Sequence, residues 1–166
     1  GKKPYMKSQK IEPELFSVIT TIQAPTPSVS GLCRTLRRAS GRLLVIGDRK
    51  GPSEYPLAGT ELFTIEQQAS LPLRLPRLLP LDHYTRKNIG YLVAISRRAS
   101  CIYETDDDNR PLTSWAVRKQ TVSSRAVSSS HWCNVYRFFS KELIWPRGIP
   151  LDQIRGPGNK VPPLGR

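Results

Sequence analysis

The sequence predicts an α/β domain with a mainly parallel central sheet. Residues 16–22 and 42–46 are apolar and β-branched, as buried strands are, and the segment between them has helical spacing. This strand–helix–strand order matches a right-handed βαβ unit, whose two strands are parallel. A second helical pattern leads into a short strand within residues 85–105 and extends the same architecture.

The first helix has clear start and stop signals. Thr26 followed by Pro27 predicts an N-cap with proline in the first helical position, and Gly41 predicts the end. Apolar residues between them recur at helical spacing: Val29, Leu32, Cys33, Leu36 and Ala39. We therefore expect one face of this helix to be buried.

The later elements follow the same reasoning. Residues 61–68 contain a short strand pattern, and a short helix is expected near residues 76–79. Thr85 is expected to cap a helix that reaches about Ala99, with Ile95 among its inward residues and a strand over 101–105 after it. Residues 114–130 predict a strand with a serine-rich loop, and residues 132–139 an ordered aromatic segment.

Composition predicts one soluble domain over residues 15–154, between a basic tail at 1–14 and a Gly/Pro-rich basic tail at 155–166. No apolar run is long enough for a transmembrane helix and no signal-peptide pattern opens the chain, so we expect a cytoplasmic protein without a transmembrane segment. The net charge of +13 is typical of a protein with an anionic ligand, such as nucleic acid, a membrane surface or a nucleotide diphosphate, and equally of a solvated basic surface.

An acidic run, "ETDDDN", stands out in this basic chain. Asp106, Asp107 and Asp108 follow the predicted strand at its carboxyl end, where open α/β sheets bind ligands. Alternation along an extended chain would place Asp106 and Asp108 on one side and Asp107 on the other. Two converging carboxylates suit Mg²⁺ or Mn²⁺, which would bridge to substrate phosphates, with Asp107 supporting. A solvated acidic turn is the structural alternative.

Basic and polar residues near this run complete the candidate site. Arg86, Lys87 and Asn88 open the second helix, where a bound phosphate would offset two cations at a helix N-terminus. Asp48, at the end of the second strand, could hydrogen-bond a base or ribose, although Asp is also a common turn residue. Two further candidates are His131 as a third metal ligand and Arg147 as a phosphate contact.

Several segments together resemble one known family. "VITTIQAPT", "LLVIGDRKGP", "LLPLDHYTRKNIGYLVAI", "IYETDDDN" and "IWPRGIPLD" are similar, in order and spacing, to the STELLO family of glycosyltransferases of the GT-A type. The resemblance covers residues 16–154. It implies a three-layer GT-A-like, nucleotide-diphospho-sugar transferase domain with a DXD motif formed by Asp106 and Asp108.

The resemblance also implies roles for further residues. Thr20, Thr21 and Ala24 would line the nucleoside pocket, with Asp48 at the base and Arg86, Lys87 and Asn88 near the donor. The resemblance identifies no catalytic base, and Glu142 and Asp152 are the candidates that the sequence offers for one.

The leading hypothesis is a metal-dependent enzyme that uses Mn²⁺ or Mg²⁺ to transfer sugar from a nucleotide-sugar to an acceptor that the sequence does not specify. A non-catalytic GT-A-like module that binds a nucleotide-sugar or a partner protein is the alternative, favoured by a second half that is short for a GT-A enzyme. Nucleic-acid binding comes last, because the aromatic residues are not interleaved with the basic runs, and we expect no nucleic-acid partner.

Overall fold

The computed structural model describes residues 15–119, 121–124 and 132–155. The chain divides into two compact units, with the boundary between Val117 and Arg118. We expected a single domain over residues 15–154, and this stays a prediction. All strands and α-helices of the described residues lie in the first unit.

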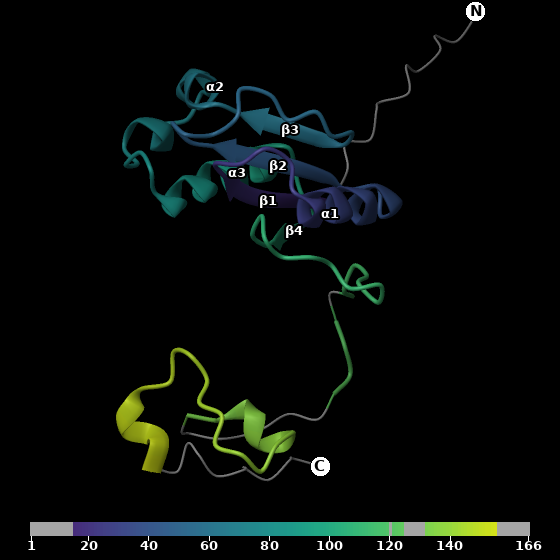
Figure 1. Cartoon of the computed structure of the whole chain (residues 1–166), viewed down its shortest axis with the longest axis vertical. Helices are drawn as coiled ribbons and strands as arrows, with labels where there is room; N and C mark the ends of the chain where they lie inside the picture. Colours follow the sequence, from purple (N-terminus) through teal and green to yellow (C-terminus); the bar gives the residue numbers. More distant parts are fainter. Residues whose placement is uncertain (1–14, 120, 125–131, 156–166) are drawn as a thin grey trace, which may run out of the picture. The chain divides into compact units, whose positions relative to one another are not determined.

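The first unit is built on a four-stranded, wholly parallel sheet (Figure 1). Its strands, in the spatial order β3-β2-β1-β4, are β1 (Leu15–Thr21), β2 (Arg42–Gly47), β3 (Thr60–Phe63) and β4 (Cys101–Glu104). Strand order reverses at β1, since β2 and β3 lie on one side of it and β4 on the other. Open α/β sheets bind ligands at such a reversal, beyond the carboxyl ends of the strands.

Helices cover both faces of the sheet, which confirms the predicted α/β fold class. Helix α1 (Pro27–Arg38) packs on the face that carries Leu15 and Ile19 of β1. Helix α3 (Lys87–Ser96) packs on the opposite face, which carries Phe16 and Val18. The split follows from strand geometry, because successive side chains of a strand point to opposite faces.

The prediction for α1 is confirmed in detail. Thr26 is its N-cap, and the Thr26 hydroxyl accepts a hydrogen bond from the Val29 N–H at 3.2 Å. Pro27 occupies the first position, and the buried side chains are Val29, Leu32, Cys33 and Leu36. Local cap chemistry and apolar spacing agree here with the tertiary packing.

The second predicted helix starts later than expected. A 3₁₀ turn, Tyr84–Arg86, precedes α3, and His83 rather than Thr85 caps that turn, its ring Nδ1 accepting the Thr85 N–H at 3.2 Å. Helix α3 ends at Ser96, and Ile95, expected to face inward, is 60% exposed.

Gly90 explains how closely α3 approaches the sheet. A Cβ at this position would lie 2.4 Å from Val18 Cγ1 and 3.0 Å from Ile46 Cγ1. Only glycine therefore fits this contact without movement of β1, β2 or the helix.

The segment between β2 and α3 contains the predicted short strand, β3, and an unpredicted helix, α2 (Ile65–Ser70). A capping box begins α2: Thr64 accepts from the Gln67 N–H, while the Gln67 side chain accepts from the Thr64 N–H at 2.8 Å. A 3₁₀ turn, Leu75–Arg77, stands near the expected short helix.

The second unit contains two 3₁₀ helices, Val135–Phe138 and Leu151–Arg155. The strand predicted over 114–130 is absent from the part of that range that the structure describes. Among the described residues, no helix is long and apolar enough to cross a membrane.

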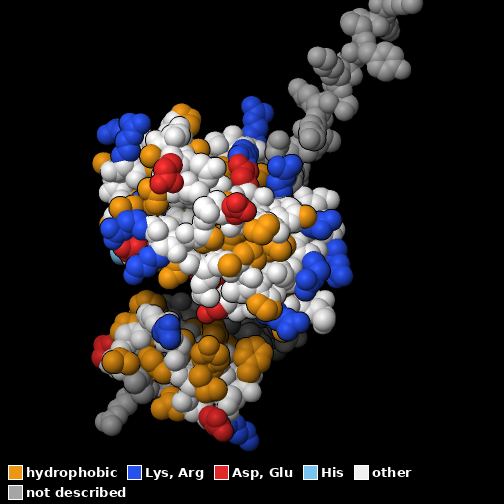
Figure 2. Space-filling view, turned by 45° about the horizontal axis from the view of Figure 1, so that its top comes forward, with side chains coloured by type: hydrophobic (Ala, Val, Ile, Leu, Met, Phe, Trp, Pro, Cys, Tyr) orange, Lys and Arg blue, Asp and Glu red, His pale blue; other side chains and the backbone are white. Residues whose placement is uncertain are grey.

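The surface of the first unit carries Lys and Arg side chains in several groups. On the face shown in Figure 2 these groups are separated by neutral and apolar surface.

Candidate functional site

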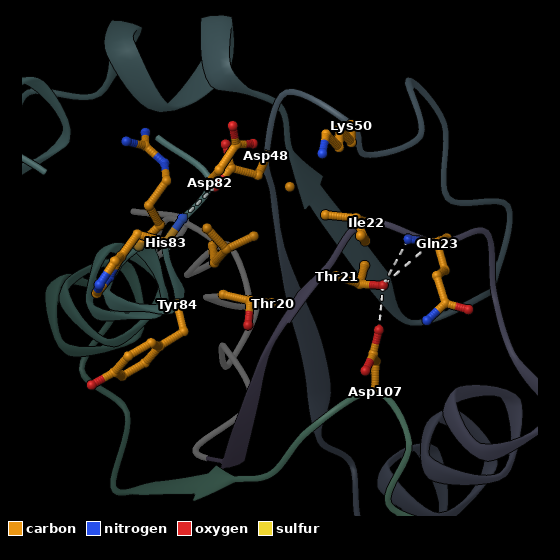
Figure 3. A pocket seen from close by; sticks show the side chains of 13 residues that line it. Thr20, Thr21, Ile22, Gln23, Asp48, Lys50, Asp82, His83, Tyr84 and Asp107 are labelled. Atoms are coloured by element: carbon orange, nitrogen blue, oxygen red, sulfur yellow. Dashed lines mark hydrogen bonds between the residues drawn. The ribbon is translucent and has the colours of Figure 1, made fainter. Parts of the chain in front are cut away.

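A pocket of about 450 Å³ lies where the carboxyl ends of β1 and β2 meet the segment before α3 (Figure 3). Asp107, from the turn after β4, completes the wall. The pocket therefore stands at the sheet edge where the strand order predicts a ligand. Its lining residues are Thr20, Thr21, Ile22, Gln23, Ile46, Gly47, Asp48, Lys50, Asp82, His83, Tyr84, Arg86 and Asp107.

The turn after β2 forms one rim of the pocket. The Gly51 N–H donates to the Asp48 carbonyl at 2.7 Å, which closes the turn. The Asp48 carboxylate accepts the Arg49 N–H at 2.8 Å through one oxygen and the His83 N–H at 3.3 Å through the other. Asp48 thus joins the β2 turn to the segment that leads into α3.

A second contact strengthens this rim. The Arg49 guanidinium pairs with the Asp82 carboxylate, and hydrogen bonding to Arg49 holds the pKa of Asp82 below its ordinary value. Asp82 has a φ of 53°, in the left-handed region that Asp tolerates better than most residues. The His83 and Tyr84 rings stack beside it with their centroids 4.8 Å apart, so the rim also presents aromatic surface.

The three aspartates form a turn rather than a continued strand. The Asn109 N–H donates to the Asp106 carbonyl at 3.3 Å, and β4 ends at Glu104. Strand alternation does not apply beyond that point, so the predicted grouping of Asp106 with Asp108 against Asp107 is not observed. Asp107 is the member of the run that lines the pocket.

Asp107 is fixed from two directions. The Thr21 hydroxyl, at the end of β1, donates to Asp107 Oδ2 at 2.6 Å. The Thr26 hydroxyl, at the start of α1, donates to the Asp107 carbonyl at 3.0 Å. Two threonines that are distant in sequence from the aspartates thus set the orientation of this carboxylate, as Figure 3 shows for Thr21.

Asp106 is held by Lys87, the first residue of α3. The Lys87 ammonium lies 2.6 Å from Asp106 Oδ1 and 2.8 Å from Glu104 Oε1, and also donates to the Thr105 carbonyl at 2.8 Å. Burial disfavours the charged ammonium, but hydrogen bonds and attraction to Asp106 and Glu104 outweigh burial and raise the pKa of Lys87. The cation that we expected to meet a phosphate thus lies against the acidic run.

Arg86 is only 2% exposed and forms part of a buried network. Its Nε and Nη2 atoms donate to Gln68 Oε1 at 2.9 and 2.6 Å. Gln68 Nε2 in turn donates to the carbonyls of Gly47 at 2.8 Å and Phe63 at 2.7 Å. Arg86 therefore supports the ends of β2 and β3, and lines the pocket as part of its frame.

The remaining predicted site residues are dispersed. Ala24 and Asn88 are exposed and outside the pocket lining, and Asn88 Nδ2 donates to the Thr85 carbonyl at 2.9 Å. Asp108 is also exposed and outside the lining. Three candidates lie in the second unit, namely Glu142, Arg147 and Asp152, and His131 lies outside the described residues.

Sequence reasoning missed several lining residues. Gln23, Lys50 and Asp82 were given no role in the site, although each lies within a segment that carries the family resemblance. Gln68 carried no signal either, because a buried glutamine is recognisable only from the carbonyls that surround it. Its position one residue after the capping-box Gln67 gives no hint of burial.

The acidic turn has the right donors for a hard divalent cation. In the described part of the chain, no group of three or more His, Cys, Asp or Glu side chains is placed to hold a metal ion. Mg²⁺ usually needs only one or two protein carboxylates, because waters and substrate phosphates complete its shell. The Asp107 carboxylate in the pocket wall, with Asp106 and Asp108 beside it, fits that smaller requirement.

Comparison with known proteins agrees with this architecture. No family model matches the chain. A protein of Arabidopsis thaliana named "Probable glycosyltransferase STELLO1" is 28% identical over 165 residues, which cover 91% of this chain and 21% of that protein. Another from the same plant, "Probable glycosyltransferase STELLO2", is 26% identical over 155 residues, or 85% of this chain and 20% of that protein.

The chain spans about a fifth of the length of the curated relatives it matches. The matched part includes most of this chain, and the strand order and the sheet-edge pocket suit the GT-A type that the motifs suggested. The resemblance is therefore confirmed: the chain is STELLO-like, homologous to one part of these two named glycosyltransferases.

Proposed function

We propose that this chain forms the nucleotide-sugar-binding part of a glycosyltransferase. The observation that carries the proposal is the pocket at the carboxyl edge of the sheet, with Asp48 on one side and Asp107 on the other. Its volume of about 450 Å³ falls within the range of small-molecule sites. The names of the two relatives support the reaction class.

The pocket residues suggest how a donor would be held. The stacked His83 and Tyr84 rings and the side chain of Ile22 offer apolar and aromatic surface for a base. Lys50, from the β2 turn, lines the pocket, is exposed and takes part in none of the ion pairs found among the described residues, so it would meet a phosphate. Asp107 would face the diphosphate across the pocket.

The Asp107 carboxylate and a diphosphate are both negative, so a cation would be required between them. Mn²⁺ or Mg²⁺, held by Asp107 with help from Asp108, would supply charge stabilisation for the nucleoside diphosphate leaving group. The chain's own part is to present Asp107 at a fixed position, through Thr21 and Thr26.

Calorimetric titration with UDP, GDP, CDP and ADP, each with and without Mn²⁺, tests the proposal. We expect one nucleotide to bind in a Mn²⁺-dependent manner and Asp107→Asn to weaken that binding by more than about tenfold, the order of effect for a charged hydrogen-bonding partner. Glu54→Gln, an exposed acid outside the pocket, is the matched control. Equal binding by Asp107→Asn and the wild type would contradict the proposal.

Turnover separates the enzyme from the binding module. The pocket lining comes wholly from the first unit, whereas the candidate bases Glu142 and Asp152 lie in the second. Incubation with nucleotide-sugars and Mn²⁺, followed by detection of nucleoside diphosphate, distinguishes the two functions. Release of the diphosphate indicates an enzyme, and binding without release indicates a module.

A further inference from the structure

The Lys87 ammonium has no proton left for a ligand. An ammonium has three N–H donors. In this chain they meet Glu104 Oε1 at 2.8 Å, the Thr105 carbonyl at 2.8 Å and Asp106 Oδ1 at 2.6 Å. Lys87 is also only 8% exposed, so a phosphate in the pocket would have to displace an existing partner to reach it.

Lys87 is buried, whereas the two acids that it contacts are exposed. The Asp106 side chain is 61% exposed and that of Glu104 is nearly as open, so water alone would solvate them well. The contact therefore orients two acids that could otherwise move freely. It does so from α3, an element packed rigidly on the sheet through Gly90.

We infer that Lys87 is a positioning residue that acts as the built-in counter-ion of the acidic turn. It binds Glu104 and Asp106, holds Asp106 away from the pocket, and leaves Asp107 as the carboxylate presented to the ligand. This inference rests on the proposed function, because it assigns roles within the same nucleotide-sugar site.

The distribution of charge supports this division of roles. The ion pairs found among the described residues include Asp106 but neither Asp107 nor Asp108. Asp107 is held by the neutral Thr21 hydroxyl, which fixes its direction without cancelling its charge. An incoming divalent cation thus finds full negative charge on Asp107 and partly neutralised charge on Asp106.

A contrary reading makes Lys87 a phosphate ligand that leaves the acids when a nucleotide binds. That reading predicts that Lys87→Met weakens nucleoside diphosphate binding and does not strengthen Mn²⁺ binding. The counter-ion role predicts the reverse for Mn²⁺, since removal of the ammonium uncovers charge on Glu104 and Asp106.

A titration of the full chain with Mn²⁺ alone tests the assignment. Electron paramagnetic resonance measures the free ion at each step of the titration. We expect Lys87→Met to bind Mn²⁺ about tenfold more tightly, the order of effect that one nearby unit charge has on a divalent ion in a water-like dielectric. Lys87→Arg keeps the charge and should stay within about twofold of the wild type. Unchanged or weaker Mn²⁺ binding by Lys87→Met would overturn the inference.

A second pair of variants tests the positioning role of Lys87 even if Lys87→Met does not fold. Asp106→Asn should lower Mn²⁺ affinity by less than Asp107→Asn does, because Asp107 would contact the ion whereas Asp106 would act on it only through its charge. Equal losses in both variants refute the positioning role while leaving the proposed function intact. A wild-type chain that binds neither Mn²⁺ nor any of the four nucleoside diphosphates refutes the proposed function itself.

Discussion

At the scale of single residues, the charges of the first unit are set by partners from distant parts of the chain. Arg97, just after α3, lies 2.7 Å from Glu61 Oε1 in β3, and the Arg97 guanidinium lies 6.0 Å from the centre of the Phe63 ring. Hydrogen bonding to Arg97 lowers the pKa of Glu61, and this outweighs the opposing effect of burial. The pair joins an edge strand to the helix that covers it.

This pair makes stability depend on pH in a defined direction. Because the folded-state pKa of Glu61 is lowered, its contribution is present above the unfolded pKa of about 4.3 and is lost as pH falls through the folded value. We expect Glu61→Gln to lower the free energy of unfolding by about 0.2–1 kcal/mol at pH 7, as for exposed ion pairs. Urea denaturation should show a smaller difference near pH 3, and Glu54→Gln should show none at either pH.

The thiols offer another residue-scale test. Burial raises the pKa of Cys33 to about 11, whereas Cys101 is exposed on β4. The thiolate is the reactive form, so Cys33 should react with a disulfide reagent far more slowly than Cys101 at pH 8. Mass spectrometry after brief labelling, in native protein and then in urea, would measure this. Equal native rates for the two thiols would contradict the packing of α1.

Some features of the candidate site could be predicted from single residues of the sequence, and others could not. Thr20, Thr21 and Asp48 line the pocket, and their place near it was predictable because strand ends are visible in the sequence and parallel strands share one ligand-binding edge. Their contact with a nucleoside stays a prediction. The alternation expected within "DDD" does not extend beyond β4, because a hydrogen bond across the turn ends it. The contacts of Lys87 with Glu104 and Asp106 were not foreseen, since these partners lie 17 and 19 residues further along the chain.

At the scale of elements, the sequence predicted best those strands and helices whose signals lie within a few residues of one another. β1, α1 and β2 were predicted closely, because caps and apolar spacing within a few residues determine them. The start of α3 shifted to Lys87, since a 3₁₀ turn capped by His83 rather than Thr85 precedes it. α2 was missed because its six residues are too few to show a period.

Gly90 tests the packing of α3. Gly90→Ala gains up to about 1 kcal/mol of helix propensity, but the added methyl group meets Val18 and Ile46, and overpacking costs about 1–3 kcal/mol. We expect a net loss of about 1 kcal/mol in the free energy of unfolding, measured with urea. Ile95→Ala in the same helix is exposed and should cost less. A more stable Gly90→Ala protein would show that the Val18 and Ile46 side chains move readily to accommodate the added methyl group.

At the scale of the whole molecule, the pocket and both faces of the core belong to the first unit. We therefore expect a fragment of residues 15–117 to unfold cooperatively and to bind the same nucleoside diphosphate with a Kd within about threefold of that of the full chain. Circular dichroism and calorimetry would measure both properties. A folded fragment without nucleotide binding would show that the second unit contributes to the site.

The Thr26 hydroxyl connects the acidic turn at the pocket to helix α1 through two hydrogen bonds. It accepts from the Val29 N–H inside α1 and donates to the Asp107 carbonyl in the acidic turn. The turn therefore cannot swing outward without loosening the first turn of the helix. A ligand that steadies Asp107 should slow hydrogen exchange at the Val29 amide, so occupancy of the site can be followed from a residue that no ligand touches.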